Sequence, residues 1–221
     1  MDSPMKVEIW SDVVCPWCYI GKRRFEKALA QFEPQAAVEV TYRSFELNPR
    51  AQPDEGTDLA TRLAHKYGVS VDQARAMNQR VTDAAAGEGL EYRLDIARPG
   101  NTFDAHRLLH LAAAEGRQAE LKERLMQGYF MEGRPIGDAD ALVTLATEVG
   151  IDAARAREVL AGAEFAGAVR ADERVAAELG ISGVPFFVFD RRFGVSGAQP
   201  PEAMAAALQH AWSEREPAAT A

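Results

Sequence analysis

The sequence predicts an α/β fold in which a small β-sheet is split along the chain by a long helical segment. Residues 6–10 alternate apolar and polar side chains as a strand does, and residues 38–45 repeat this pattern. Further apolar runs of strand length follow only after residue 185. Between them, residues 57–162 show almost entirely helical patterns. We therefore expect one sheet with a large, all-helical insertion.

Each element has its own signal. After the first strand, Phe25, Leu29 and Phe32 recur at helical spacing. In the insertion, residues 70–73 have capping-box spacing, and Leu108, Leu109 and Ala112 form an apolar helical stripe. The remaining predicted elements are helices at 118–131, 138–149, 152–161, 165–179 and 200–213 and strands at 186–190 and 193–196.

The two cysteines, Cys15 and Cys18, lie at the junction between the first strand and the first helix. At a helix N-terminus, unpaired N–H groups and the helix dipole favour an anion, which lowers a thiol pKa. Pro16 suits the first helical turn, which needs no N–H from it. This position predicts Cys15 as an exposed nucleophile and Cys18, almost one turn further on, as an inward-facing resolving thiol.

Two other uses of the cysteine pair fit the sequence less well. A structural disulfide over so short a loop would constrain the unfolded chain little, and 221 residues can bury a core without one. A zinc site needs four ligands, and the sequence has no second cysteine pair. His106 and His110 could share a metal but lack a third ligand, so one half-buried and one solvated histidine is the expected arrangement. We predict no metal site.

Three other features have two interpretations each. Pro185 opens an apolar run, and is either an ordinary trans proline or part of the site. Asp12 either influences the Cys15 thiol, as a proton acceptor or a like charge, or only caps the turn. Residues 22–24 are basic, and form either a solvated helix face or a positive field that supports the thiolate and attracts acidic substrates.

Two further groups of residues are expected mainly to build the insertion. Asn101 either caps the helix that starts near Thr102 or contacts the substrate. We expect Met126, Tyr129, Phe130 and Met131 to pack the insertion rather than to form a peptide-binding stripe.

Residues 11–22, which contain Cys-Pro-Trp-Cys, and the distant Gly183-Val184-Pro185-Phe186 together resemble the DsbA-like thioredoxin superfamily, in particular its FrnE-like cytoplasmic branch. Other segments similar to that group are residues 45–49, 101–107 and 196–199. The fold expected from this resemblance is a thioredoxin-like domain with a large helical insertion, as in DsbA. The predicted divisions are a discontinuous thioredoxin-like domain at 1–56 and 163–214, an insertion at 57–162 and a disordered tail at 215–221.

The resemblance also implies roles for individual residues. Cys15 would be the attacking thiolate, Cys18 the resolving thiol, and Val184-Pro185 a substrate-facing cis-proline turn. Pro16 and Trp17 would tune the redox couple. Strongly oxidising relatives have a histidine where this chain has Trp17, which implies a more reducing or isomerase-like poise. The second cysteine pair of some relatives is absent here.

The predicted function is that of a thiol–disulfide oxidoreductase or isomerase that works through its dithiol and a mixed disulfide, with no bound cofactor and with glutathione as a candidate co-substrate. The alternative is a glutathione-dependent, non-redox transferase or isomerase acting on a small molecule, as in the similar kappa-class glutathione transferases and 2-hydroxychromene-2-carboxylate isomerases. In those enzymes a serine replaces the nucleophilic cysteine, so Cys15 argues against this chemistry. A redox-inert binding module is a third alternative.

Composition restricts the partners. The net charge of −8 disfavours nucleic acid and anionic membranes, which select for basic patches. No run of about 18 apolar residues occurs, which disfavours a membrane span. The first residues lack the pattern of a secretory signal, so we predict a cytoplasmic protein whose partners carry thiols or disulfides.

Overall fold

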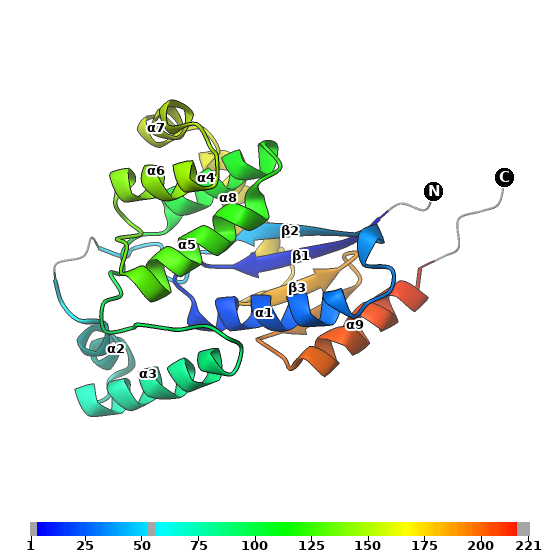
Figure 1. Cartoon of the computed structure of the whole chain (residues 1–221), viewed down its shortest axis with the longest axis horizontal. Coiled ribbons are helices and arrows are strands. Elements are labelled where there is room, and N and C mark those ends of the chain that lie inside the picture. Colours follow the sequence, from blue (N-terminus) through cyan, green and yellow to red (C-terminus); the bar gives the residue numbers. More distant parts are fainter. Residues whose placement is uncertain (1–3, 53–55, 216–221) are drawn as a thin grey trace.

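The computed structural model describes residues 4–52 and 56–215, in which four strands form one mixed sheet (Figure 1). The strand order is β2-β1-β3-β4. Strand β1 (Met5–Ser11) is parallel to β2 (Val38–Ser44) and antiparallel to β3 (Phe186–Phe189), which pairs with β4 (Phe193–Ser196). The connection from β1 to β2 passes through α1 (Pro16–Ala30). The predicted α/β fold with a helical insertion is confirmed.

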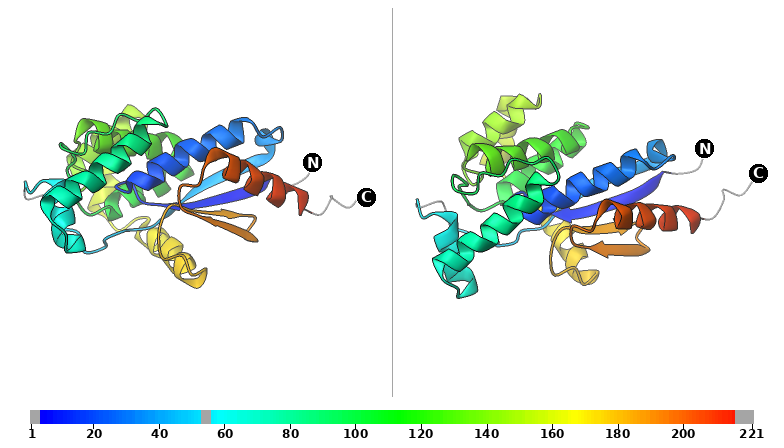
Figure 2. Two further views of the ribbon diagram at one scale, coloured as in Figure 1. Left: turned by 90° about the horizontal axis from the view of Figure 1, so that it is seen from below. Right: turned by 60° about the horizontal axis from the view of Figure 1, so that its bottom comes forward.

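Helices cover both faces of the sheet (Figure 2). Alternate residues of β1 and β3, such as Ile9 and Phe187, face α1 and α9 (Pro201–Ser213) and form one core with them. The opposite face, with Trp10 and Val188, packs on α8 (Ala166–Glu178). Because side chains alternate along a strand, both faces of the two central strands can be buried.

The insertion consists of two parts. Helices α4 (Phe103–Ala114), α5 (Gln118–Glu132), α6 (Ala139–Glu148) and α7 (Ala153–Ala161) share one apolar core, which also includes Cys15 and Cys18. Helices α2 (Leu59–Tyr67) and α3 (Val71–Ala86) have a small apolar cluster of their own and form a separate pair in Figure 1. The predicted capping box is present, since the side chains of Ser70 and Gln73 bind each other's backbone N–H.

The prediction that residues 57–162 are almost entirely helical is wrong for residues 87–102, which form turns and irregular chain between α3 and α4. Gly87 caps the end of α3, and Gly89 has a φ of +78°, which ends the helical path. The predicted division into domains stays a prediction. Residues 216–221 of the predicted tail lie outside the described residues.

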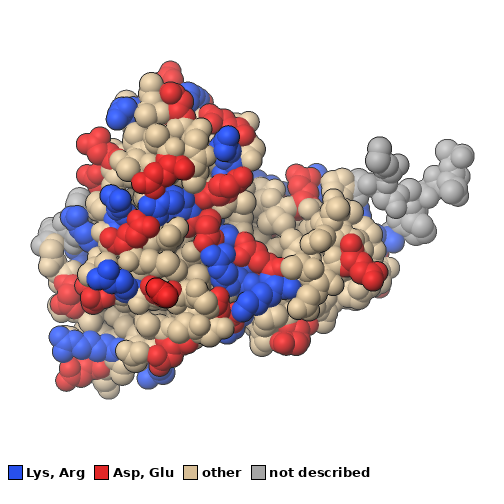
Figure 3. Space-filling view, in the orientation of Figure 1, with Lys and Arg blue, Asp and Glu red and all other residues tan. Residues whose placement is uncertain are grey.

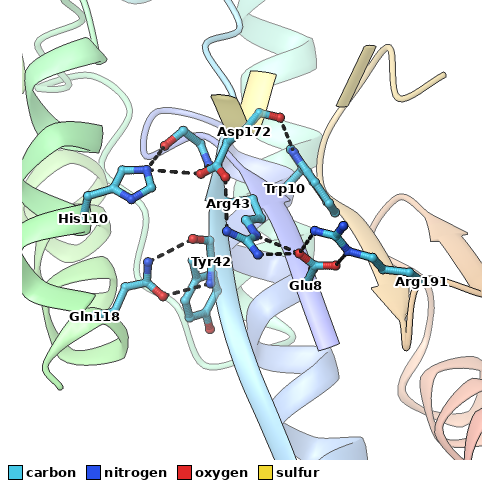
Figure 4. A network of polar contacts seen from close by, with 9 residues as sticks. Glu8, Trp10, Tyr42, Arg43, His110, Gln118, Asp172 and Arg191 are labelled. Carbon is cyan, nitrogen blue, oxygen red and sulfur yellow. Dashed lines mark hydrogen bonds and ion pairs between the residues drawn. The ribbon is translucent and has the colours of Figure 1, made fainter. Parts of the chain in front are cut away.

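Side chains of the helices complete the exposed edge of strand β2 (Figure 4). The Gln118 amide accepts a hydrogen bond from the Tyr42 N–H and donates one to the Tyr42 carbonyl, both 2.9 Å long. Further along, Asp172 of α8 accepts from the Ser44 N–H at 2.9 Å and contacts His110 of α4 at 3.1 Å. An edge strand has unpaired backbone groups. Here they are used to attach the helices to the sheet.

The surface mixes charges of both signs. On the face shown in Figure 3, acidic and basic side chains are interspersed over most of the protein. In the described part of the chain, none of the helices combines the length and the apolar character needed to cross a bilayer.

Candidate active site

Both cysteines lie at the start of α1, as predicted. Cys15 is the N-cap residue, with extended backbone, and Pro16 is the first residue of the helix. The Cys18 N–H donates to the Cys15 carbonyl at 3.0 Å. Both thiols are free, and their residues are 4% and 2% exposed. The expectation of an exposed Cys15 is therefore wrong, because neighbouring segments cover it.

The loop before β3 is one of these segments. The Val184–Pro185 peptide bond is cis. The Cys15 thiol donates a hydrogen bond to the Val184 carbonyl, with an Sγ–O distance of 3.6 Å. Pro185 lies so close to α1 that a Cβ on Gly21 would be 2.9 Å from the Pro185 Cγ. A glycine at position 21 thus lets the loop approach the dithiol.

The insertion covers the site from the other side. The Tyr92 hydroxyl donates to the Pro16 carbonyl at 2.7 Å, and the Tyr92 ring stacks on Phe130 with centroids 4.5 Å apart. Phe130 is buried, in agreement with the predicted packing role, and it also lines a cleft at the dithiol. Trp17 lies at the same cleft and is 45% exposed.

Asp12 is buried and binds three segments of the chain. Its carboxylate accepts hydrogen bonds from the Val13 and Leu47 N–H groups, each 2.8 Å long. Its Oδ1 lies 3.2 Å from Nε2 of His106 on α4. Burial alone would raise the pKa of Asp12, but the hydrogen bond and charge of His106, together with the Leu47 N–H and Lys122, hold it below its usual value.

The two histidines do not share a site. His110 contacts Ser44 and Asp172, whereas His106 contacts Asp12. His106 is buried and His110 half-buried, so the expected solvated histidine is wrong. Over residues 4–52 and 56–215, no group of three or more metal-ligating side chains occurs. The role of His106 beside Asp12 was missed, although it lies in the segment 101–107 that carried the family resemblance.

The electrostatics of the thiols differ from the expectation. The hydrogen bond to Cys18, then burial, then the charge of Cys18 raise the pKa of Cys15 well above its usual value. Burial would also raise the pKa of Cys18, but the contact with the Cys15 side chain, the charge of Lys122 and the Ser11 hydroxyl lower it. Two adjacent thiols titrate as a pair.

The basic residues 22–24 are neutralised by carboxylates. Lys22 binds Glu26 and Glu123, each at 2.5 Å, and Arg23 binds the same two carboxylates. Arg24 binds Glu88 at 2.7 Å. The residues therefore do not form the expected solvated face, and the carboxylates offset the proposed positive field. Asn101 does act at the start of α4, since its side chain accepts from the Phe103 N–H at 2.9 Å.

A cleft of about 1090 Å³ lies between the dithiol and the α2–α3 pair. Cys15, Pro16, Trp17 and Val184 line one side of it. Several of its other lining residues are exposed and either apolar or basic: Leu47, Tyr67, Arg50, His65 and Lys66. Among the lining residues within the described chain, the buried Asp12 is the only acid. A cleft of this kind beside reactive side chains is typical of a binding site.

Comparison with known proteins agrees with this architecture. Residues 6–209 match the model of the DSBA-like thioredoxin domain. The chain is 51% identical to a probable DsbA oxidoreductase from Streptomyces coelicolor, whose crystal structure has a TM-score of 0.92 over 98% of this chain and 94% of that one. YwbO of Bacillus subtilis (strain 168), an uncharacterized protein, is 29% identical over 194 residues, which are 82% of this chain and 85% of YwbO.

The cytosolic disulfide reductase DsbM of Pseudomonas aeruginosa, determined with GSH, has the same fold, with a TM-score of 0.64 and 19% identity over 94% of this chain and 99% of that one. These similarities support an oxidoreductase or isomerase in general terms. The match over residues 6–209 shows that the chain belongs to the family of DSBA-like thioredoxin domains.

Proposed function

We propose that this protein is a thiol–disulfide oxidoreductase or isomerase that works through Cys15 and Cys18. The observation that carries the proposal is the position of the Cys15 thiol. It lines the cleft at the N-terminus of α1, 3.6 Å from the Val184 carbonyl, with the free Cys18 thiol in hydrogen-bond contact behind it. This arrangement supplies one sulfur to meet a substrate and a second to release it.

The reaction balances with the two thiols alone. The Cys15 thiolate attacks a substrate disulfide, forms a mixed disulfide and releases the first substrate thiolate. The Cys18 thiolate then attacks Cys15, which forms the Cys15–Cys18 disulfide and releases the second substrate thiolate. The two protons of the dithiol pass to the released thiolates. The enzyme is thereby oxidised by two electrons, and two external thiols reduce it again through the reverse exchange.

The lining of the cleft supports a substrate with both apolar and acidic parts. Trp17, Leu47 and Tyr67 offer exposed apolar surface in the cleft that Cys15 also lines. Arg50 and Lys66 offer positive charge for carboxylates, and His65 adds a polar imidazole. Glutathione is a thiol that carries carboxylates. We include glutathione as the candidate reductant. Because glutathione keeps thiols reduced in the cytoplasm, we also propose a cytoplasmic location. No bound cofactor is required.

Trapping the mixed disulfide tests the mechanism. In a Cys18→Ser variant, oxidised glutathione should add one glutathione to Cys15, which intact mass and peptide mapping will detect. A Cys15→Ser variant should lose disulfide reduction. Adduct formation at Cys18 alone would reverse the assigned roles. Full activity of Cys15→Ser on a small molecule that contains no disulfide would favour a non-redox enzyme.

The reduction potential of the Cys15–Cys18 pair decides the direction of the reaction. Equilibration in glutathione buffers of graded potential, followed by Trp17 fluorescence and intact mass, will measure it. A potential between about −270 and −120 mV is typical of exchange enzymes, and with Trp17 in the motif we expect the reducing half of that range. A potential below about −300 mV would indicate a structural disulfide instead.

A further inference from the structure

Lys122 of α5 is a lysine in the core of the protein. Its residue has no exposed surface. Its ammonium group donates to the Ser11 carbonyl at 3.1 Å, at the carboxyl end of β1 where the chain turns toward the dithiol. It also lies 5.9 Å from the centre of the Tyr42 ring. A buried ammonium group is costly unless an anion accompanies it.

Among the groups around Lys122, the Cys18 thiolate is the best candidate for that anion. The charged groups that act most on its pKa are Cys18, Asp12, Cys15 and Lys22, and the Tyr42 ring lies beside it. The Asp12 carboxylate already accepts from two backbone N–H groups and contacts His106. Cys15 donates to Val184, whereas Cys18 is a buried, free thiol in the same core as Leu121 and Leu125, which flank Lys122 on α5. A negative charge on Cys18 therefore acts on the Lys122 ammonium group.

Ser11 adds a second polar group on the same side. Its hydroxyl is buried, and within the described residues it has no hydrogen-bond partner at normal geometry. It is nevertheless close enough to Cys18 to favour a negative charge on that sulfur. Two polar groups therefore act on the Cys18 thiol. One is the Ser11 hydroxyl, and the other is the Lys122 ammonium group that binds the Ser11 carbonyl.

We propose that Lys122, together with the Ser11 hydroxyl, is the electrostatic partner of the Cys18 thiolate. This inference rests on the proposed exchange function, because a charged Cys18 is the group that attacks Cys15 in the resolving step. It gives the helical insertion a chemical role besides shaping the cleft. Lys22 makes a useful contrast, since it is also buried but is held by Glu26 and Glu123.

The interaction must act in both directions. Burial lowers the pKa of Lys122 to about 8, and a negative charge on Cys18 opposes this decrease. When Cys18 attacks Cys15, a disulfide forms and the charge leaves with the substrate thiolate. Lys122 then loses its anion and should release its proton more readily. By linkage, the negative charge on Cys18 shifts the pKa of Lys122 as much as the positive charge of Lys122 shifts the pKa of Cys18.

The test is a thiolate titration that needs no turnover. In a Cys15→Ser background only Cys18 remains, and ultraviolet absorbance follows its thiolate against pH. Lys122→Met should raise the titration midpoint by about one pH unit or more, which is tenfold less thiolate at a given pH. Ser11→Ala should shift it in the same direction by less. Lys22→Met, the matched control, should leave it nearly unchanged.

Lys122→Met keeps the size of the side chain and removes a buried charge, so it is expected to fold. A folded Lys122→Met variant with an unchanged midpoint would overturn the proposal, as would an equal shift in Lys22→Met. If Lys122→Met does not fold, the ¹³Cε resonance of Lys122 in the unsubstituted protein decides the matter. Its titration midpoint should be higher in the reduced state, and equal midpoints would overturn the proposal. Failure of the exchange function would show separately, as no adduct in Cys18→Ser.

Discussion

The Asp12 carboxylate and the His106 imidazole form a buried pair, with Oδ1 and Nε2 3.2 Å apart. Asp12 follows β1 and precedes Cys15 by three residues, whereas His106 comes from α4 of the insertion. The same carboxylate also holds the Leu47 N–H, beyond the end of β2. One side chain therefore joins the sheet, the dithiol turn and the insertion, and its charge acts on the adjacent thiols.

Asp12→Asn should make Cys15 more acidic. The negative charge of Asp12 contributes to the raised pKa of Cys15, and asparagine removes that charge but retains the shape. In a Cys18→Ser background, the alkylation rate of Cys15 against pH should have a lower midpoint than in the same background with Asp12. Asp140→Asn, on the exposed surface of α6, is the control. An unshifted profile would leave Asp12 with a structural role only.

Asp12 should also make stability depend on pH. Its pKa is lower in the folded protein than the unfolded value of 3.8. Its contribution is therefore complete above the unfolded pKa and is lost as the pH falls through the folded pKa. By urea unfolding at pH 6, Asp12→Asn should cost about 1.5–3 kcal/mol, typical of hydrogen bonds to a charged group. This difference from the unsubstituted protein should shrink below about pH 4. A constant difference would contradict the assigned charge.

The sequence predicted the parts of the site that depend on local pattern. Cys15, Pro16 and the strand-to-helix junction could be located because alternation and helical spacing are short-range signals. The position of Val184 and Pro185 could not, since these residues are about 170 positions away along the chain. Only the family resemblance, carried by short motifs in the correct order, brought that loop to the dithiol.

The features that were missed depend on which polar side chains the tertiary fold turns inward. Lys122 lies between leucine and glutamate in a charged part of its helix, and nothing in that pattern marks it as buried. The charges of Lys22 and Arg23 are offset by Glu26 together with Glu123, which lies about 100 residues further along. Cys15 is buried because the Pro185 loop and Tyr92 pack over the helix start. Periodicity carries no information about such distant contacts.

Gln118→Ala should loosen the attachment of the insertion to the sheet. The substitution leaves the N–H and carbonyl of Tyr42, a buried residue, without their side-chain partners. We expect a loss of about 1–3 kcal/mol in the free energy of unfolding. Gln127→Ala, on the exposed side of the same helix, should change stability by less than about 0.5 kcal/mol. Urea unfolding of both variants measures the difference, and equal effects would contradict a special role for Gln118.

Gly21→Ala should separate the dithiol from the Pro185 loop. The new Cβ would be 2.9 Å from the Pro185 Cγ and 3.4 Å from the Ala198 Cβ, so the loop must move away from α1. The Val184 carbonyl moves with it and leaves its place 3.6 Å from the Cys15 Sγ. Overpacking costs about 1–3 kcal/mol and outweighs the gain of up to about 1 kcal/mol from alanine in a helix.

The rate of disulfide exchange distinguishes this displacement from a simple loss of stability. Displacement of reacting groups by about 1 Å can cost up to about 100-fold in rate. We therefore expect the Gly21→Ala variant to remain folded but to reduce oxidised glutathione about tenfold more slowly or worse. Gly167→Ala in α8 is the matched control, because its Cβ would meet nothing within 4 Å. That variant should keep the original rate and gain slightly in stability. An unchanged rate in Gly21→Ala would show that exchange does not depend on the contact between the dithiol and the Pro185 loop.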